Sequence, residues 1–121
     1  MKLLIVEDDK RIKKMILAMT CDLADESFEC ENGLQAFVIY AEHLPDWVLM
    51  DLMMPELDGI SATRKIISSF PNAKIIIVTS IKSDAMQETS RLAGACGYVL
   101  KENLADIRNI ITNQNGYNYE K

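Results

Sequence analysis

The stretch LLIVEDD, residues 3–9, places four apolar residues directly before three acidic ones. The same order, an apolar run followed by polar or charged residues, recurs in WVLMD (47–51), IIIVTS (75–80) and YVLK (98–101). Such runs are typical of buried strands, and a charge directly after one is costly unless it faces a site. We therefore expect these strand ends to converge on a pocket for a divalent cation and a phosphoryl group.

Helix-period stretches alternate with the apolar runs. Helices are predicted over residues 10–23, 32–43, 58–70, 83–94 and from 103 onward, with a weaker strand at 27–30 that fits a sheet edge. In the first helix, Met15 is expected on the apolar face with Ile12, Ile16 and Met19. The caps expected for the other helices are Asn32, Asp58, Ser83 and Asn103.

Five strand–helix pairs with unbroken apolar strands predict an α/β fold, a five-stranded parallel sheet covered by helices on both faces. In such sheets ligands bind beyond the carboxyl ends of the strands, where the charged residues would lie. We expect one domain over residues 1–112 and a polar tail or linker start over 113–121.

Composition excludes several classes of function. A net charge of −5 argues against nucleic-acid binding by this domain alone. The N-terminal sequence matches neither a signal peptide nor a membrane span, which favours a cytoplasmic protein. The odd cysteine count is interpreted as small buried thiols in a reducing compartment. His43 is the only histidine, so a histidine pair and a three-histidine zinc site are excluded.

The acidic strand ends have a chemical interpretation. Glu7, Asp8 and Asp51 cannot lie close together fully charged without a counter-ion, and Mg²⁺ binds carboxylate oxygens. Asp51 could act as a nucleophile toward phosphorus, with Lys101 meeting a phosphate oxygen. Thr79 or Ser80 could donate a hydroxyl hydrogen bond to the same group. For Asp9, capping the first helix is the favoured alternative.

The motifs VEDD, LMDLMMPELDG, VTS and GYVLK, in this order, resemble the receiver domain of two-component response regulators, from Lys2 to about Thr112. GYVLKE is closest to the NarL/FixJ type. The resemblance implies a CheY-like, flavodoxin-like sheet of order 2-1-3-4-5. It also implies a signalling switch rather than an enzyme, with at most slow self-phosphorylation and self-dephosphorylation.

The resemblance further implies residue roles. Asp51 would be the phosphoacceptor, with Mg²⁺ or Mn²⁺ held by Asp8, Asp51, the Met53 backbone carbonyl and, through water, Glu7. Thr79 would be the switch hydroxyl, followed by the small residue Ser80, and Lys101 would bridge to the phosphoryl group. Tyr98 would be the aromatic switch that turns inward. Met53 and Ile81 are apolar neighbours of the expected phosphate, which predicts slow self-dephosphorylation.

The implied partners are a histidine kinase, a second copy after phosphorylation, and a C-terminal DNA-binding output domain. Glu102 stands where many members of the family carry a proline after the lysine, so the resemblance does not fix the conformation of the loop after Lys101. Three alternatives stay open: a stand-alone or unphosphorylated interaction module, a flavin- or nucleotide-binding protein, and a metal-dependent phosphatase.

Overall fold

Each apolar run of the sequence forms a strand, and strands and helices alternate along the chain. The computed structural model describes residues 1–113. Its elements are β1 (Lys2–Val6), α1 (Lys10–Thr20), β2 (Glu26–Cys30), α2 (Gly33–His43), β3 (Trp47–Met50), α3 (Gly59–Ser69), β4 (Ile75–Thr79), α4 (Asp84–Ala93), β5 (Gly97–Leu100), a short 3₁₀ turn (Lys101–Asn103) and α5 (Ala105–Thr112).

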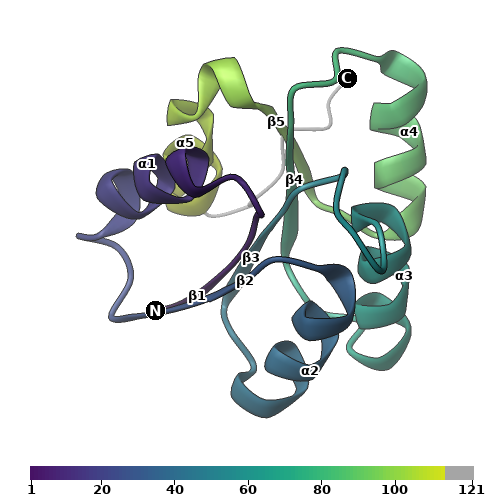
Figure 1. Cartoon of the computed structure of the whole chain (residues 1–121), viewed down its shortest axis with the longest axis horizontal. Coiled ribbons are helices and arrows are strands. Elements are labelled where there is room, and N and C mark those ends of the chain that lie inside the picture. Colours follow the sequence, from purple (N-terminus) through teal and green to yellow (C-terminus); the bar gives the residue numbers. More distant parts are fainter. Residues whose placement is uncertain (114–121) are drawn as a thin grey trace.

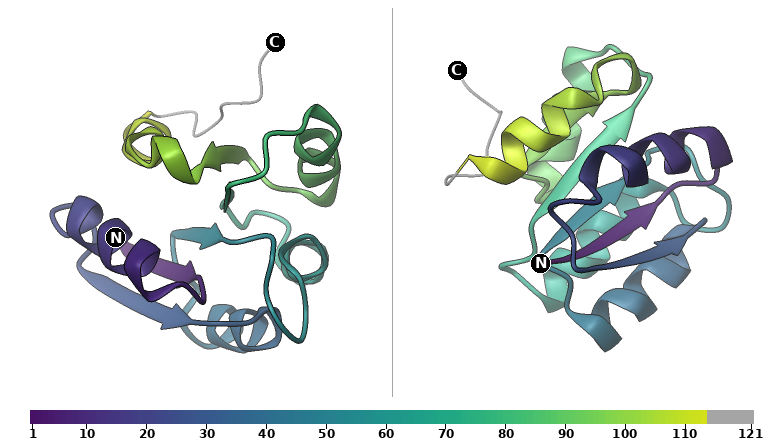
Figure 2. Two further views of the ribbon diagram at one scale, coloured as in Figure 1. Left: turned by 45° about the horizontal axis from the view of Figure 1, so that its top comes forward. Right: turned by 90° about the vertical axis from the view of Figure 1, so that its left-hand side faces the viewer.

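The five strands form one parallel sheet in the order β2-β1-β3-β4-β5. Helices α1 and α5 cover one face, and α2, α3 and α4 cover the other (Figures 1 and 2). The predicted fold class, strand order and edge position of β2 are confirmed. The order reverses beside β1, so β1 and β3 flank the switch point where ligands bind in such sheets.

The core has two layers because successive side chains of a buried strand point to opposite faces. On β1, Leu3 and Ile5 pack under α1 and α5 against Ile16 and Ile107, whereas Leu4 lies in the layer under α2 and α3. All of these side chains are buried. Each contributes about 1.5–3 kcal/mol relative to an exposed side chain, which makes the sheet a rigid support for its loops.

Most of the predicted helix starts are confirmed. The side chains of Asn32, Asp58 and Ser83 each accept a backbone N–H in the first turn of α2, α3 and α4. Asp9 does the same for α1, as its alternative role predicted. Asn103 as the cap of the last helix is wrong: it lies inside the 3₁₀ turn, and α5 begins at Ala105 without a side-chain cap.

Two further sequence predictions need correction. Ile16 is buried and Ile12 and Met19 pack against the core as predicted, but Met15 is 52% exposed. The other buried residue of α1 is Thr20, where the helix ends rather than at residue 23. Cys30 and Cys96 are buried as expected, but Cys21, just after α1, is exposed. Burial raises the pKa of Cys30 to about 11, which keeps this thiol protonated.

Among the helices formed by residues 1–113, none combines the length and apolarity needed to cross a membrane. The predicted tail, apart from Asn113, lies outside the described residues.

Candidate functional site

Parallel pairing brings the polar strand ends together at one edge of the sheet. Val6 pairs with Met50, so the residues that follow them, Glu7 and Asp51, leave β1 and β3 side by side. The backbone N–H of Asp51 donates to the Val6 carbonyl over 3.0 Å. On the other side, Thr79 pairs with Leu100, which places Lys101 next to the end of β4.

Lys101 bridges the two buried carboxylates. Its Nζ lies 3.4 Å from Asp51 Oδ1 and donates to Glu7 Oε2 over 3.2 Å. The Glu7 and Asp51 side chains are only 2% and 4% exposed. The proximity of residues 7, 51 and 101, on which the interpretation of the sequence depends, is therefore confirmed.

The carboxylates outnumber the cation that faces them. Ligand oxygens of Glu7, Asp8 and Asp51 lie within 4.8 Å of one another, with Asp8 on the exposed side. Glu7 Oε1 is buried and accepts no hydrogen bond, although the Lys101 ammonium lies 3.2 Å away, outside hydrogen-bond geometry. An all-oxygen cluster with excess negative charge and an unsatisfied oxygen fits a hard divalent cation. This acidic pocket is thus able to bind a metal ion.

The same crowding of buried charged groups shifts the pKa values of Glu7, Asp51 and Lys101. Burial, aided by the neighbouring Asp51 carboxylate, raises the pKa of Glu7 to about 7. Burial also raises the pKa of Asp51, although the Lys101 ammonium opposes it. For Lys101 burial disfavours the charged form, but the carboxylates of Asp51 and Glu7 outweigh it and raise its pKa. The lysine therefore stays protonated between the two acids.

Thr79 and Tyr98 are linked through the loop that follows β4. Thr79 is 1% exposed, and its Oγ1 accepts the Ile81 N–H over 3.2 Å, so its own hydroxyl proton can point elsewhere. The Tyr98 hydroxyl donates to the Ile81 carbonyl over 2.7 Å, and the ring is 8% exposed. The expected switch aromatic is thus already inward in this structure. Ser80 is exposed.

The loop after β3 supplies further site residues. The Met53 backbone amide opposes the rise in the pKa of the Asp51 carboxyl, while the Met53 side chain is 69% exposed. Ile81 is half-buried. A metal-ligand role for the Met53 carbonyl, and a role of either side chain in phosphoryl lifetime, stay predictions.

Two features of the site escaped the sequence analysis. Gly59 donates its N–H to the Leu52 carbonyl, and a Cβ there would lie 2.1 Å from the Asp51 carbonyl oxygen. The Asp-Gly pair before an apolar helix was a signal for a close backbone approach. The second is an ion pair between Lys82 and Glu102. Both residues are exposed, and neither a motif nor their spacing in the sequence indicates that they pair.

Comparisons with known proteins agree with this geometry. A family model described as the response regulator receiver domain matches residues 3–112. The chain is 38% identical over 104 residues to the uncharacterized transcriptional regulatory protein YhcZ of Bacillus subtilis, covering 84% of this chain and 49% of that protein. It is also 38% identical over 103 residues to the chemotaxis protein CheY of Halobacterium salinarum, covering 83% of each.

A solved two-component response regulator of the LuxR family, from Aurantimonas sp. SI85-9A1, superposes with a TM-score of 0.84 at 29% identity, covering 91% of this chain and 81% of that one. The chain spans about half the length of regulatory proteins such as YhcZ and LnrK of Bacillus subtilis.

Proposed function

Given that the chain belongs to the response regulator receiver domain family, we propose that it is a phosphorylation-dependent switch of a two-component system, with Asp51 as phosphoacceptor. The observation that carries the proposal is the position of Lys101, whose ammonium touches both Asp51 and Glu7 at the carboxyl ends of three strands. A single cation among buried acids is suited to receive one more anionic group. The donor is a phosphohistidine on a partner kinase or a small acyl phosphate.

In the proposed transfer, an Asp51 carboxylate oxygen attacks phosphorus and the bond from phosphorus to the donor's leaving atom breaks. Lys101 stabilises the charge on the phosphoryl oxygens, and the Thr79 hydroxyl donates a hydrogen bond to one of them. Asp8, Asp51, the Met53 carbonyl and, through water, Glu7 would hold Mg²⁺ or Mn²⁺, which supplies charge neutralisation. The protein consumes its own acyl phosphate slowly instead of turning over an external ester.

Phosphorylation would act as a population shift. Thr79 and Lys101 re-pair toward the phosphoryl group, and the packing of Tyr98 between β5 and α4 changes with them. Because Tyr98 is inward here, the proposal requires inward and outward positions to exchange before phosphorylation. The face formed by α4, β5 and α5 then alters its affinity for a second copy or for an output domain.

The natural setting is proposed from the relatives. Transcriptional regulatory proteins such as YhcZ are about twice as long as the matched region, which favours a C-terminal DNA-binding output domain. A cytoplasmic location is part of the same proposal. CheY proteins are matched over most of their length, which favours the alternative of a stand-alone module.

The test is the intact mass after incubation with acetyl phosphate and Mg²⁺. The wild type is expected to gain one phosphoryl mass that hydroxylamine removes, whereas Asp51→Asn gains none. Asp106→Asn, a matched change at an exposed residue of α5, is expected to behave as the wild type. An unmodified wild type, or a labelled Asp51→Asn variant, would refute the proposal and favour an unphosphorylated interaction module.

Metal binding is tested separately by Mg²⁺ titration of the intrinsic fluorescence. Trp47 is the only tryptophan and begins β3, the strand that leads to Asp51. Saturable quenching or enhancement that Asp8→Asn weakens is expected. A response that Asp8→Asn leaves unaltered would place the ion elsewhere.

A further inference from the structure

An exposed ion pair joins the two segments that carry the proposed switch residues. Lys82 Nζ lies 3.1 Å from Glu102 Oε2, and the two side chains are 67% and 61% exposed. Lys82 lies in the loop between β4 and α4, three residues after Thr79. Glu102 directly follows Lys101 in the turn after β5. The pair therefore connects the loop that follows Thr79 to the turn that contains Lys101.

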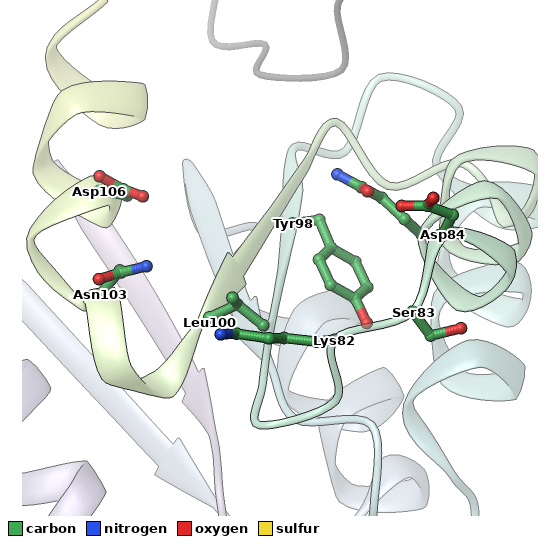
Figure 3. Close-up of a pocket in the computed structure, with 8 residues that line it drawn as sticks. Lys82, Ser83, Asp84, Tyr98, Leu100, Asn103 and Asp106 are labelled. Atoms are coloured by element: carbon green, nitrogen blue, oxygen red, sulfur yellow. The ribbon is translucent and has the colours of Figure 1, made fainter.

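Tyr98 lies beside Lys82, one member of this ion pair (Figure 3). Figure 3 shows the Lys82 side chain running past the Tyr98 hydroxyl toward Leu100 at the end of β5. These three residues line a cavity of about 390 Å³ between α4 and α5. Ile81, the neighbour of Lys82, accepts the Tyr98 hydroxyl and donates to Thr79 Oγ1. A displacement of Lys82 would therefore be transmitted to both Tyr98 and Thr79 through one residue, Ile81.

We propose that Lys82 and Glu102 are a positioning pair, which fixes the loop between β4 and α4 beside Tyr98 and so sets where the Thr79 hydroxyl lies relative to Lys101 and Asp51. Neither residue touches the reacting atoms. The effect on loop position stands by itself, and only its effect on phosphorylation rests on the proposed function. The pair sets how often the inward Tyr98 position is populated before any phosphoryl group arrives.

The size of the effect follows from exposure. Exposed ion pairs are weak and screened by salt, and losing one changes a two-state population ratio by up to about fivefold. The pair therefore biases the switch without locking it, because the hydrogen bond from Tyr98 to Ile81 remains when the ion pair is lost. Reversing one charge of the pair places two like charges together. It is therefore expected to change the ratio of inward to outward Tyr98 more than neutralising one charge does.

The first experiment uses the unphosphorylated protein labelled with 3-fluorotyrosine, with the Tyr98 signal assigned from Tyr98→Phe. Lys82→Glu is expected to increase the outward population two- to fivefold. Combining it with Glu102→Lys is expected to restore the wild-type signal. Because salt screens both attraction and repulsion, high salt should bring the wild-type and Lys82→Glu spectra closer together, and should shift the doubly reversed variant as it shifts the wild type.

A matched control separates this pair from surface charge in general. Glu88 pairs with Arg91 within α4 and is similarly exposed. Glu88→Gln therefore removes an ion pair that lies within one helix and does not connect two segments. Glu102→Gln is expected to shift the Tyr98 signal and Glu88→Gln is not. Equal responses to the two changes, or a double charge reversal that fails to restore the signal, would overturn the proposal.

The second experiment measures the rate of phosphorylation by acetyl phosphate in the same variants. Lys82→Glu is expected to be two- to fivefold slower, with rescue by Glu102→Lys. If Asp51 is not a phosphoacceptor, no variant is modified while the fluorine signals still respond to charge. Normal rates in Lys82→Glu together with a shifted Tyr98 signal would overturn the claim that the pair positions Thr79.

Discussion

Replacing Glu7 by Gln is expected to stabilise the metal-free protein at alkaline pH and to flatten the pH dependence of its stability. The Glu7 side chain is 2% exposed. Burial and the Asp51 carboxylate raise its pKa from an ordinary 4.5 to about 7. Gln has the same shape and can still accept the hydrogen bonds from Lys101 and the Asp9 N–H, but it carries no charge to be desolvated.

The sign follows from proton linkage. The folded protein holds the Glu7 proton more tightly than the unfolded chain, so folding carries no penalty below the unfolded pKa near 4.5. The penalty grows as pH rises and is complete above about 7. A tenfold change in proton affinity is worth about 1.4 kcal/mol, so the full penalty is about 3 kcal/mol. The raised pKa of Asp51 acts in the same direction.

The assay is urea unfolding followed by Trp47 fluorescence in EDTA, at about pH 5 and about pH 8. The wild type is expected to lose about 2–3 kcal/mol of unfolding free energy between the two, and Glu7→Gln less than half of that. Glu42→Gln, at an exposed position of α2, is the matched control and should follow the wild type. A wild type equally stable at both pH values, or a Glu7→Gln variant with the full loss, would refute the reasoning.

Other predictions concern the acyl phosphate, one close backbone approach and one strained residue. Met53→Asn with Ile81→Glu places polar groups near the phosphoryl group on Asp51 that can orient water, so decay of the phosphorylated mass should be about tenfold faster; an unaltered lifetime would contradict this. Gly59→Ala should cost about 2 kcal/mol or more in urea unfolding, because its methyl group would lie 2.1 Å from the Asp51 carbonyl oxygen. Leu44 ends α2 with φ 48° and is 58% exposed. Because asparagine adopts this left-handed conformation more readily than leucine, Leu44→Asn should raise the free energy of unfolding by about 0.5 kcal/mol and so raise the thermal midpoint. A lowered midpoint would count against strain at this position.

The architecture was predictable because its signals are local. Unbroken apolar runs mark parallel strands, and caps such as Asn32 and Asp58 act within one turn of their own helix. The strand order came from the resemblance, since alternation alone leaves several orders open. Failures occurred where tertiary packing decides. Met15 is apolar and correctly spaced, yet it is exposed, whereas the polar Thr20 is buried and donates its hydroxyl hydrogen bond to the Ile16 carbonyl.

The site was predictable for a topological reason. Carboxyl ends of neighbouring parallel strands must meet, so Glu7, Asp51 and Lys101 were expected together although they are far apart in sequence. The sequence could not predict how deeply each site residue is buried or which loop residues form an ion pair next to the site. That Glu7 is buried more completely than the phosphoacceptor candidate, and that Lys82 reaches Glu102, depends on distances between loops that no spacing in the sequence encodes.

The electrostatics of the pocket suggest why stability and the proposed function oppose each other here. Three carboxylates face one ammonium, so the metal-free folded state carries uncompensated negative charge that the unfolded chain would hydrate freely. An apolar residue in place of Glu7 would remove the penalty, but it would also remove an oxygen ligand. A divalent cation and a phosphoryl group together add charges of opposite sign to the same pocket. Because Lys101 alone cannot neutralise the acids, each ligand improves the site for the other. Without these ligands the pocket keeps an unfavourable excess of negative charge, and relief of this charge is what allows ligands to shift the protein between two states.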